Sequence, residues 1–230
     1  MPVVVAIDGP SGSGKSSVSR EVAGRLGLQY LDTGAMYRAA CWSALDAGLD
    51  LKDAAAVAAH VRALDLQVST DPERQRTRVG GVDVSAMIRE QRISAAVSTV
   101  ATNLEVRAEL RRRQREIIAA ARRDDGIVAE GRDITTVVAP EAQVRILLTA
   151  SEQARLERRA REVHGQADAD VVESMRDVVV RRDADDATVS TFHVAADGVV
   201  QIDSSGMGFE ETVQAVLAVC RTSIAGSVPA

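Results

Sequence analysis

Residues 9–16 have the sequence G-P-S-G-S-G-K-S, directly after the apolar run 3–7 and directly before a segment with helical periodicity. The glycines at positions 9, 12 and 14 allow backbone angles closed to other residues, so that consecutive N–H groups can wrap a phosphate chain. The helix start adds its unpaired N–H groups and the positive end of its dipole. The pattern therefore predicts a phosphate-binding loop, the alternative being a glycine turn that fits the pattern by chance.

Two side chains of this loop have expected chemical roles. The Lys15 ammonium can reach the β and γ phosphates of a nucleoside triphosphate, and Ser16 is placed to bind Mg²⁺. Lys15 and Lys52 are the only lysines among 28 basic residues, and a compact ammonium fits beneath a phosphate where a planar guanidinium does not. The predicted donor-site residues are Gly9, Pro10, Ser11, Gly12, Ser13, Gly14, Lys15, Ser16 and Ser17.

The segments around the loop predict an α/β fold. A helix through Leu26 ends at Gly27, and residues 28–31 form a short strand before a polar turn and a helix to about residue 47. Buried parallel strands are expected at 126–130 and 144–148, and a last strand at 198–203. Helices are expected at about 151–163, at 170–182 before a polar run 182–187, and at 209–220 before a loose tail from Arg221. Residues 131–133 follow a strand end, where ligands of open α/β sheets bind.

The stretch from 53 to 123 has a different character. A helix over 53–64 precedes three short alternating segments at 64–69, 76–79 and 82–84, separated by Asp-Pro and Gly-Gly. Helices follow at about 91–102 and 104–123. We therefore predict a small antiparallel sheet inserted into the parallel fold.

Composition favours a protein that acts on small molecules. The chain has 230 residues, 46% apolar content, a net charge of −5 and five aromatic residues, so a basic surface and stacking rings for nucleic acid are missing. The first 30 residues lack the pattern of a signal peptide, and no apolar run is long enough to span a membrane. We expect a cytoplasmic location and one domain covering residues 1–230.

Arginines at three places could gather around two anions. Arg38 follows one predicted strand end, Arg132 follows another, and Arg155, Arg158 and Arg159 follow a third. Phosphoryl transfer depends on positioning and charge neutralisation, and an acceptor phosphate needs no general base. The arginine-rich helix face at positions 111, 112, 113 and 115 is interpreted as solvated.

These residues resemble a known family. The glycine loop, the run 31–38 (L-D-T-G-A-M-Y-R), the helix end 111–115 (R-R-R-Q-R) and the run 130–138 (E-G-R-D-I-T-T-V-V) together are similar to bacterial cytidylate kinases over nearly the whole chain. The resemblance implies a P-loop NTPase three-layer fold with a central five-stranded parallel sheet, a monophosphate-binding insert at 36–113 and a lid at 155–186. It implies transfer of a phosphoryl group from ATP, with Mg²⁺, to CMP or dCMP by a monomer that binds neither nucleic acid nor membrane.

The resemblance also implies roles for individual residues. Lys15, Arg132, Arg159 and Arg182 would be catalytic, and Arg155 would cover the bound ATP together with Arg159. The implied monophosphate-site residues are Thr33, Tyr37, Arg38, Ser98, Arg107, Arg132, Asp133, Arg182 and Asp186, with Ser98, Arg107 and Asp133 facing the cytosine. The chain has Val189 where the family usually has a further lid arginine, and Phe192 and His193 near the usual Pro-Leu.

Other classes of protein share part of these features. A shikimate or gluconate kinase would share the loop but be shorter and lack the inserted sheet. A regulatory GTPase would need an N-K-x-D motif, which the sequence does not contain. A nucleotide-gated RNA-binding module could use the arginine helix, although the net charge opposes it.

Overall fold

The computed structural model describes residues 2–226, except for the side chains of residues 162–164, 177 and 178. Its centre is a five-stranded sheet in which every neighbouring pair is parallel. In spatial order the strands are β2 (Gln29–Asp32), β6 (Gly126–Gly131), β1 (Val3–Asp8), β7 (Val144–Thr149) and β8 (Val200–Asp203). The predicted parallel sheet is confirmed.

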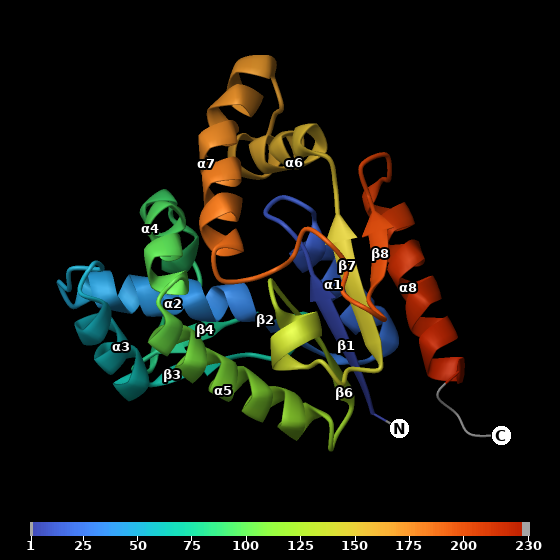
Figure 1. The fold of residues 1–230 in the computed structure, drawn as a ribbon, viewed down its shortest axis with the longest axis horizontal. Coiled ribbons are helices and arrows are strands. Elements are labelled where there is room, and N and C mark those ends of the chain that lie inside the picture. The colour runs from blue at the N-terminus through green and yellow to red at the C-terminus, as the bar shows by residue number, and fades with distance from the viewer. Residues whose placement is uncertain (1, 227–230) are drawn as a thin grey trace.

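Apolar residues alternate between the two faces of the sheet and define three layers. On β1, Val5 and Ile7 pack with α1 (Lys15–Leu26) and α8 (Phe209–Gly226). Val4 and Ala6 instead join a core with α2 (Thr33–Asp46) and α5 (Leu104–Ala121). Since side chains of a strand alternate between faces, one apolar strand supplies both cores. Figure 1 shows α8 beyond β8 and α5 on the opposite side of the sheet.

The predicted small antiparallel sheet is present and is separate from the central sheet. The segment that holds it contains α3 (Ala54–Ala63), β3 (Leu66–Val68), β4 (Thr77–Val79), β5 (Val82–Asp83), the 3₁₀ turn η1 (Met87–Arg89) and α4 (Gln91–Ala101). The helices α3 and α4 pack in the same core as β1 and α5. The strands β3, β4 and β5 pair antiparallel, as predicted. Val79, Val84 and Ile88 pack against α2 in a core of their own, which holds the insert beside the strand ends.

Two helices lie above the C-terminal ends of the strands (Figure 1). They are α6 (Glu152–His164) and α7 (Ala169–Ala187), and they share a small core that includes Leu156, Ala160 and Val179. The prediction that the helix ends near Arg182 is wrong, because α7 continues through the polar run to Ala187. The buried aspartates of this run face arginines of other elements, so the helix does not expose them unpaired.

The last helix also exceeds its prediction. Val213, Val216, Leu217 and Cys220 are buried against the sheet as expected, but α8 continues to Gly226, so the tail expected from Arg221 is helical to that point. The remainder of the predicted tail, residues 227–230, lies outside the described residues.

The two cysteines are free thiols in different cores. Cys41 packs in the core with α2, and Cys220 packs with α1 and α8. Burial raises the pKa of each thiol to about 11. No helix in the part of the chain that the structure describes is long and apolar enough to cross a bilayer.

Candidate active site

Three glycines shape the loop between β1 and α1. Gly14 has a φ of 86°, in the left-handed region that residues with a Cβ rarely adopt. Gly12 has a φ of 75°, and a Cβ on it would lie 2.7 Å from the backbone oxygen of Arg155. Gly9 is not in the left-handed region, but a Cβ there would overlap the backbone oxygen of Leu148 on β7. The predicted need for unusual backbone angles is correct for Gly12 and Gly14 and wrong for Gly9, where glycine provides space.

Lys15 and Ser16 meet a carboxylate near the end of β6. The Lys15 Nζ lies 3.5 Å from the carbonyl oxygen of Pro10 and 4.0 Å from Oε2 of Glu130, and the Ser16 hydroxyl donates to Glu130 Oε1 at 2.6 Å. Burial, assisted by the charge of Arg132, lowers the pKa of Lys15 to about 8. At neutral pH this lysine therefore still places a positive charge at the start of α1.

Glu130 is a site residue that the sequence prediction missed. It is buried, and burial together with the nearby Asp32 carboxylate raises its pKa. The signal in the sequence was an acidic residue at the end of an otherwise apolar strand. Its contacts with Lys15 and Ser16 make it the connection between β6 and the glycine loop.

The start of α2 holds the first group of predicted acceptor residues. Asp32 caps this helix by accepting from the Ala35 N–H at 2.8 Å, and its other oxygen accepts from Arg38 Nη2 at 2.8 Å. Burial would raise the pKa of Asp32, but Arg38 and the Ala35 N–H hold it below its ordinary value. Thr33 donates to the Glu130 carbonyl at 2.8 Å. Arg38 is thus held in place, with one side of its guanidinium compensated, before any anion arrives.

A second group lies between α5 and the end of β6. Asp133 Oδ2 accepts from Arg107 Nη2 at 2.5 Å, and from Arg111 Nε at 3.0 Å and Nη2 at 2.5 Å. The Arg107 guanidinium also lies over the Tyr37 ring, 5.8 Å from its centroid. The structure therefore brings together Tyr37, Arg107 and Asp133, all of them predicted monophosphate-site residues, and it adds Arg111.

Asp8 fixes the backbone that follows Asp133. This residue ends β1, and its carboxylate accepts from the N–H groups of Ile134 and Thr135 at 2.8 Å each and from the Thr135 hydroxyl at 2.6 Å. These groups belong to the first turn of η2 (Ile134–Val138), a short π-helix. Burial outweighs the three hydrogen bonds and raises the pKa of Asp8 to about 6. Asp8 thereby anchors the turn from which Asp133 projects.

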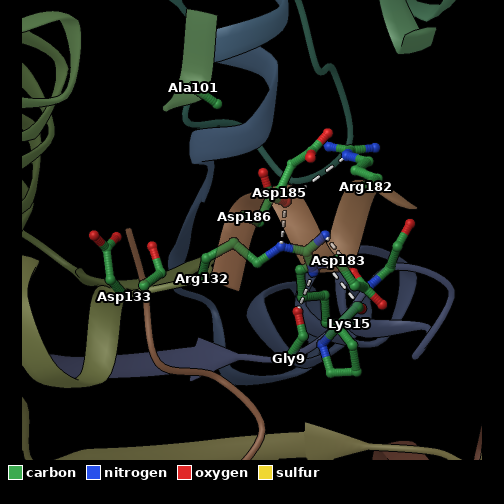
Figure 2. Close-up of polar contacts among 12 residues, drawn as sticks. Gly9, Lys15, Ala101, Arg132, Asp133, Arg182, Asp183, Asp185 and Asp186 are labelled. Carbon is green, nitrogen blue, oxygen red and sulfur yellow. Dashed lines mark hydrogen bonds and ion pairs between the residues drawn. The ribbon is translucent and has the colours of Figure 1, made fainter. Parts of the chain in front are cut away.

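Arg132 connects the glycine loop with α7, as Figure 2 shows. Its Nε donates to Asp186 at 3.0 Å and its Nη2 to Asp183 at 3.1 Å, while Nη1 donates to the Gly9 carbonyl. The ring of the fully buried Phe192 lies 4.7 Å from its guanidinium carbon. The neighbouring Asp133 side chain points away from the Arg132 guanidinium in the same view. Two adjacent residues therefore serve opposite parts of the site.

The predicted lid arginines have different environments. Arg155 is buried and donates to the Ser11 carbonyl at 2.9 Å and to Asp183, whose other oxygen accepts from the Ser11 N–H at 2.9 Å. Arg158, also on α6, donates to the Ser13 carbonyl at 3.1 Å. Arg182 lies with its Nε 3.9 Å from Asp186, and burial and the charge of Arg132 lower its pKa to about 10. Arg155 and Asp183 therefore brace the loop itself.

These groups surround a cavity of about 500 Å³. The predicted residues that line it are Ser11, Gly12, Lys15, Ser16, Ser17, Thr33, Tyr37, Arg38, Arg107, Arg132, Asp133, Arg159, Arg182 and Asp186. The predicted residues outside its lining are Gly9, Pro10, Ser13, Gly14, Ser98 and Arg155. The lining residues that the prediction did not include are Asp32, Gly34, Arg89, Ser94, Val97, Ala101, Glu130 and Gly131.

The structure differs from the sequence predictions on α4 and on α5. Ser94, one turn before Ser98, lines the cavity on α4, whereas the Ser98 carbonyl accepts from the Thr102 hydroxyl at 2.9 Å. The interpretation of the α5 arginines as a solvated face is correct for Arg112, which is 54% exposed and paired with Glu109 and Glu116. It is also correct for Arg115, which is exposed although it donates to two backbone carbonyl groups, and it is wrong for Arg111 and Arg113. Arg113 binds carbonyl groups at the end of α3, and Arg115 binds those of η2.

The oxygen donors near Lys15 suit a small hard cation. Among the described residues no group of three or more His, Cys, Asp and Glu side chains is arranged to hold a metal ion. Mg²⁺, however, commonly uses one or two protein oxygens and takes its other ligands from water and substrate phosphates. The Ser16 hydroxyl beside the Glu130 carboxylate is a donor set of that kind.

Comparisons with known proteins agree on one family. A family model described as cytidylate kinase matches residues 5–222. A cytidylate kinase of Nocardia farcinica is 50% identical over 214 residues, which are 92% of this chain and 90% of that protein. Cytidylate kinases of Cutibacterium acnes and Streptomyces avermitilis are 47% and 44% identical, covering 94% of this chain in both comparisons and 95% and 91% of those proteins.

Proposed function

This chain belongs to the cytidylate kinase family, and from that premise we infer that it transfers the γ-phosphoryl group of ATP to CMP or dCMP, giving ADP and CDP or dCDP. One observation of the structure supports this inference above the others. A single cavity has a phosphate-binding loop on one side and, on the other, a pocket built from Tyr37, Arg107 and Asp133. A donor and an acceptor can therefore meet within it.

We propose that the donor triphosphate lies along the glycine loop. The N–H groups of the loop and of the start of α1 would bind its phosphates, and Lys15 would neutralise charge on the transferred group. Arg159 and Arg182 line the same cavity and would add positive charge there. For Arg155 the contacts with Ser11 and Asp183 support a role in bracing the loop in place of the predicted contact with ATP.

We propose that the acceptor phosphate lies near Arg38 and Arg132. Both guanidinium groups are already held by carboxylates, so little reorganisation is needed when the phosphate binds, and preorganised charge is what phosphoryl transfer requires. A phosphate dianion is itself the nucleophile, so no side chain has to remove a proton. The base would lie toward Tyr37, Arg107 and Asp133, with Asp186 near the sugar.

Mg²⁺ would be held by Ser16, with Glu130 beside it, and would neutralise charge between the donor phosphates when bound. We also propose that residues 36–113 and the lid residues 155–186 close over the substrates and exclude water.

Two free thiols fit a reducing compartment such as the cytoplasm, where we propose that the enzyme acts as a monomer.

A coupled assay of ADP release tests the function. Purified protein with ATP and Mg²⁺ is offered CMP, dCMP, UMP, AMP and GMP, with shikimate and gluconate as acceptors of a different class. We expect CMP and dCMP to give the highest kcat/KM. Turnover of shikimate or gluconate without turnover of CMP would contradict the proposal. Light scattering after size exclusion measures the oligomeric state.

A further inference from the structure

The carboxylate of Asp133 is held on one oxygen only. Three N–H groups, one from Arg107 and two from Arg111, donate to Oδ2, and in the part of the chain that the structure describes no guanidinium donates to Oδ1. Asp133 is 4% exposed and lines the cavity. With Oδ2 saturated by donors, Oδ1 is the oxygen through which this carboxylate can accept a hydrogen bond from a ligand.

Arg111 differs from Arg107 in its surroundings. Both project from α5 four residues apart, which places them on the same face of the helix. Arg107 lines the cavity and is also fixed by the Ala101 carbonyl at 3.0 Å and by the Ser190 hydroxyl at 2.6 Å. Arg111 is not part of the cavity lining, and its hydrogen bonds go to Asp133. The hydrogen bonds of Arg111 therefore reach the cavity through Asp133, and its charge also acts on Tyr37, which lines the cavity.

We propose that Arg111 is a positioning residue for base selection. By binding Oδ2 through two N–H groups, it fixes the rotation of the carboxylate and leaves Oδ1 to accept from the N4 amino group of cytosine. Uracil presents an acceptor oxygen at the same position and meets an unpaired lone pair. This inference rests on the proposed function and extends it, because selectivity then depends on a side chain outside the cavity.

Loss of Arg111 should affect the carboxylate more than the rest of the pocket. Arg107 keeps its two other partners, so it is expected to stay in place. Asp133 keeps a single donor, and a carboxylate with one donor can rotate and present either oxygen. A buried polar mismatch changes affinity by roughly 5- to 150-fold, and partial loss of alignment should fall at the lower end of that range.

The experiment compares Arg111→Gln, Arg111→Lys and the control Arg112→Gln, measured with saturating ATP on CMP and UMP. Arg112 is the next residue of α5, and it pairs with Glu116 and Glu109 on the exposed face of the helix. Its loss should therefore leave kcat/KM for both CMP and UMP unchanged. We expect Arg111→Gln to lower kcat/KM for CMP about tenfold, chiefly through KM, and to change UMP less than about twofold. Arg111→Lys retains the charge and can donate to Oδ2, but it lacks the planar pair of N–H groups, so it should restore part of the ratio of kcat/KM for CMP to that for UMP.

A purely structural role for Arg111 predicts a different result. Loss of such a role would lower the melting temperature and reduce kcat/KM equally for CMP and UMP. An unchanged ratio of kcat/KM for CMP to that for UMP in correctly folded Arg111→Gln therefore overturns the proposal. An equal change in Arg112→Gln also overturns it. If Arg111→Gln does not fold, the same ratio measured in Arg111→Lys decides. Turnover of CMP by the unaltered enzyme is measured first, so failure of the proposed function is seen separately.

Discussion

The donor half and the acceptor half of the cavity are built in different ways. The donor half is one continuous segment, in which backbone angles at Gly12 and Gly14 and the start of α1 create the binding surface. The acceptor half consists of side chains from α2, α5 and the end of β6, and ion pairs fix them. The first design depends on the conformation of a few adjacent residues. The second depends on tertiary contacts between residues far apart in the chain.

The junction of the two halves is a pair of neighbours. Arg132 reaches the glycine loop and α7, while Asp133 reaches α5. Their side chains diverge in Figure 2. Substitutions that act in one half should therefore leave the recognition of the other substrate largely unchanged, and the following tests address that separation.

The largest effect is expected for Lys15→Ala. The ammonium neutralises charge that develops during transfer, and loss of one such group lowers kcat by roughly 10²- to 10³-fold or more. Lys15→Arg should also be poor, because a planar fork does not fit the loop. Steady-state kinetics measures kcat, which depends on the donor half, and calorimetry measures the affinity for CMP, which depends on the acceptor half. Near-normal turnover would contradict the role of Lys15, and a loss of CMP affinity as large as the loss of kcat would contradict the separation of the donor and acceptor halves.

The next effect is expected for Asp133→Asn in the acceptor half. An amide offers a donor as well as an acceptor, so it should lower kcat/KM for CMP and narrow the ratio of CMP to UMP by about 5- to 150-fold. The KM for ATP should change little. An equal decrease for CMP and UMP would mean that Asp133 does not select the base and that Arg107 must do so.

A smaller and separate effect is expected from pH. Lys15 loses its charge as pH rises through its pKa of about 8, so kcat/KM for ATP, which reports the free enzyme, should fall about tenfold per pH unit above that value. With ATP bound, phosphate charge favours the protonated forms of both Lys15 and Arg182, so kcat/KM for CMP at saturating ATP should show no fall near pH 8. Lys52→Ala is the matched control, because Lys52 is the other lysine. A flat ATP profile to pH 9.5 would contradict the prediction.

The smallest effect tests, at the end of α1 away from the cavity, the same argument from backbone angles that applies to Gly12 and Gly14. Gly24 and Gly27 belong to α1 and its end, and a Cβ on either would meet nothing within 4 Å, but Gly27 has a φ of 65°. Gly24→Ala should stabilise the protein by about 0.5–1 kcal/mol and Gly27→Ala should destabilise it by about 1 kcal/mol. Thermal unfolding measures the two shifts. Shifts of the same sign would show that φ does not decide the outcome.

The two halves also differ in how far the sequence predicts them. The glycine loop, its flanking strand and helix, the parallel sheet and the inserted antiparallel sheet follow from local spacing and periodicity, and the structure contains all of them. The grouping of Thr33, Arg107 and Asp133 came from family resemblance, since no spacing rule connects residues from such distant segments. Pairings such as Arg111 with Asp133 depend on how α5 packs on the sheet, which local pattern does not specify.

The end of α7 shows the same limit in another way. A run of aspartates predicts a helix end when considered alone, because unpaired acidic residues are costly at that position. In the structure Asp183 and Asp186 accept from Arg132 and Arg155, and the helix continues. The missing information was the position of two arginines from other elements.

The burial of Cys41 and Cys220 has a practical consequence for measuring motion. With a pKa of about 11 for each, only on the order of one thiol in a few thousand is ionised at pH 7.5, and alkylating dyes react with the thiolate. Cysteines introduced at Leu104, which is 69% exposed, and at Glu173 on the exposed face of α7 can therefore be labelled on the native background. The distance between two such dyes would follow the approach of the insert and the lid in single molecules.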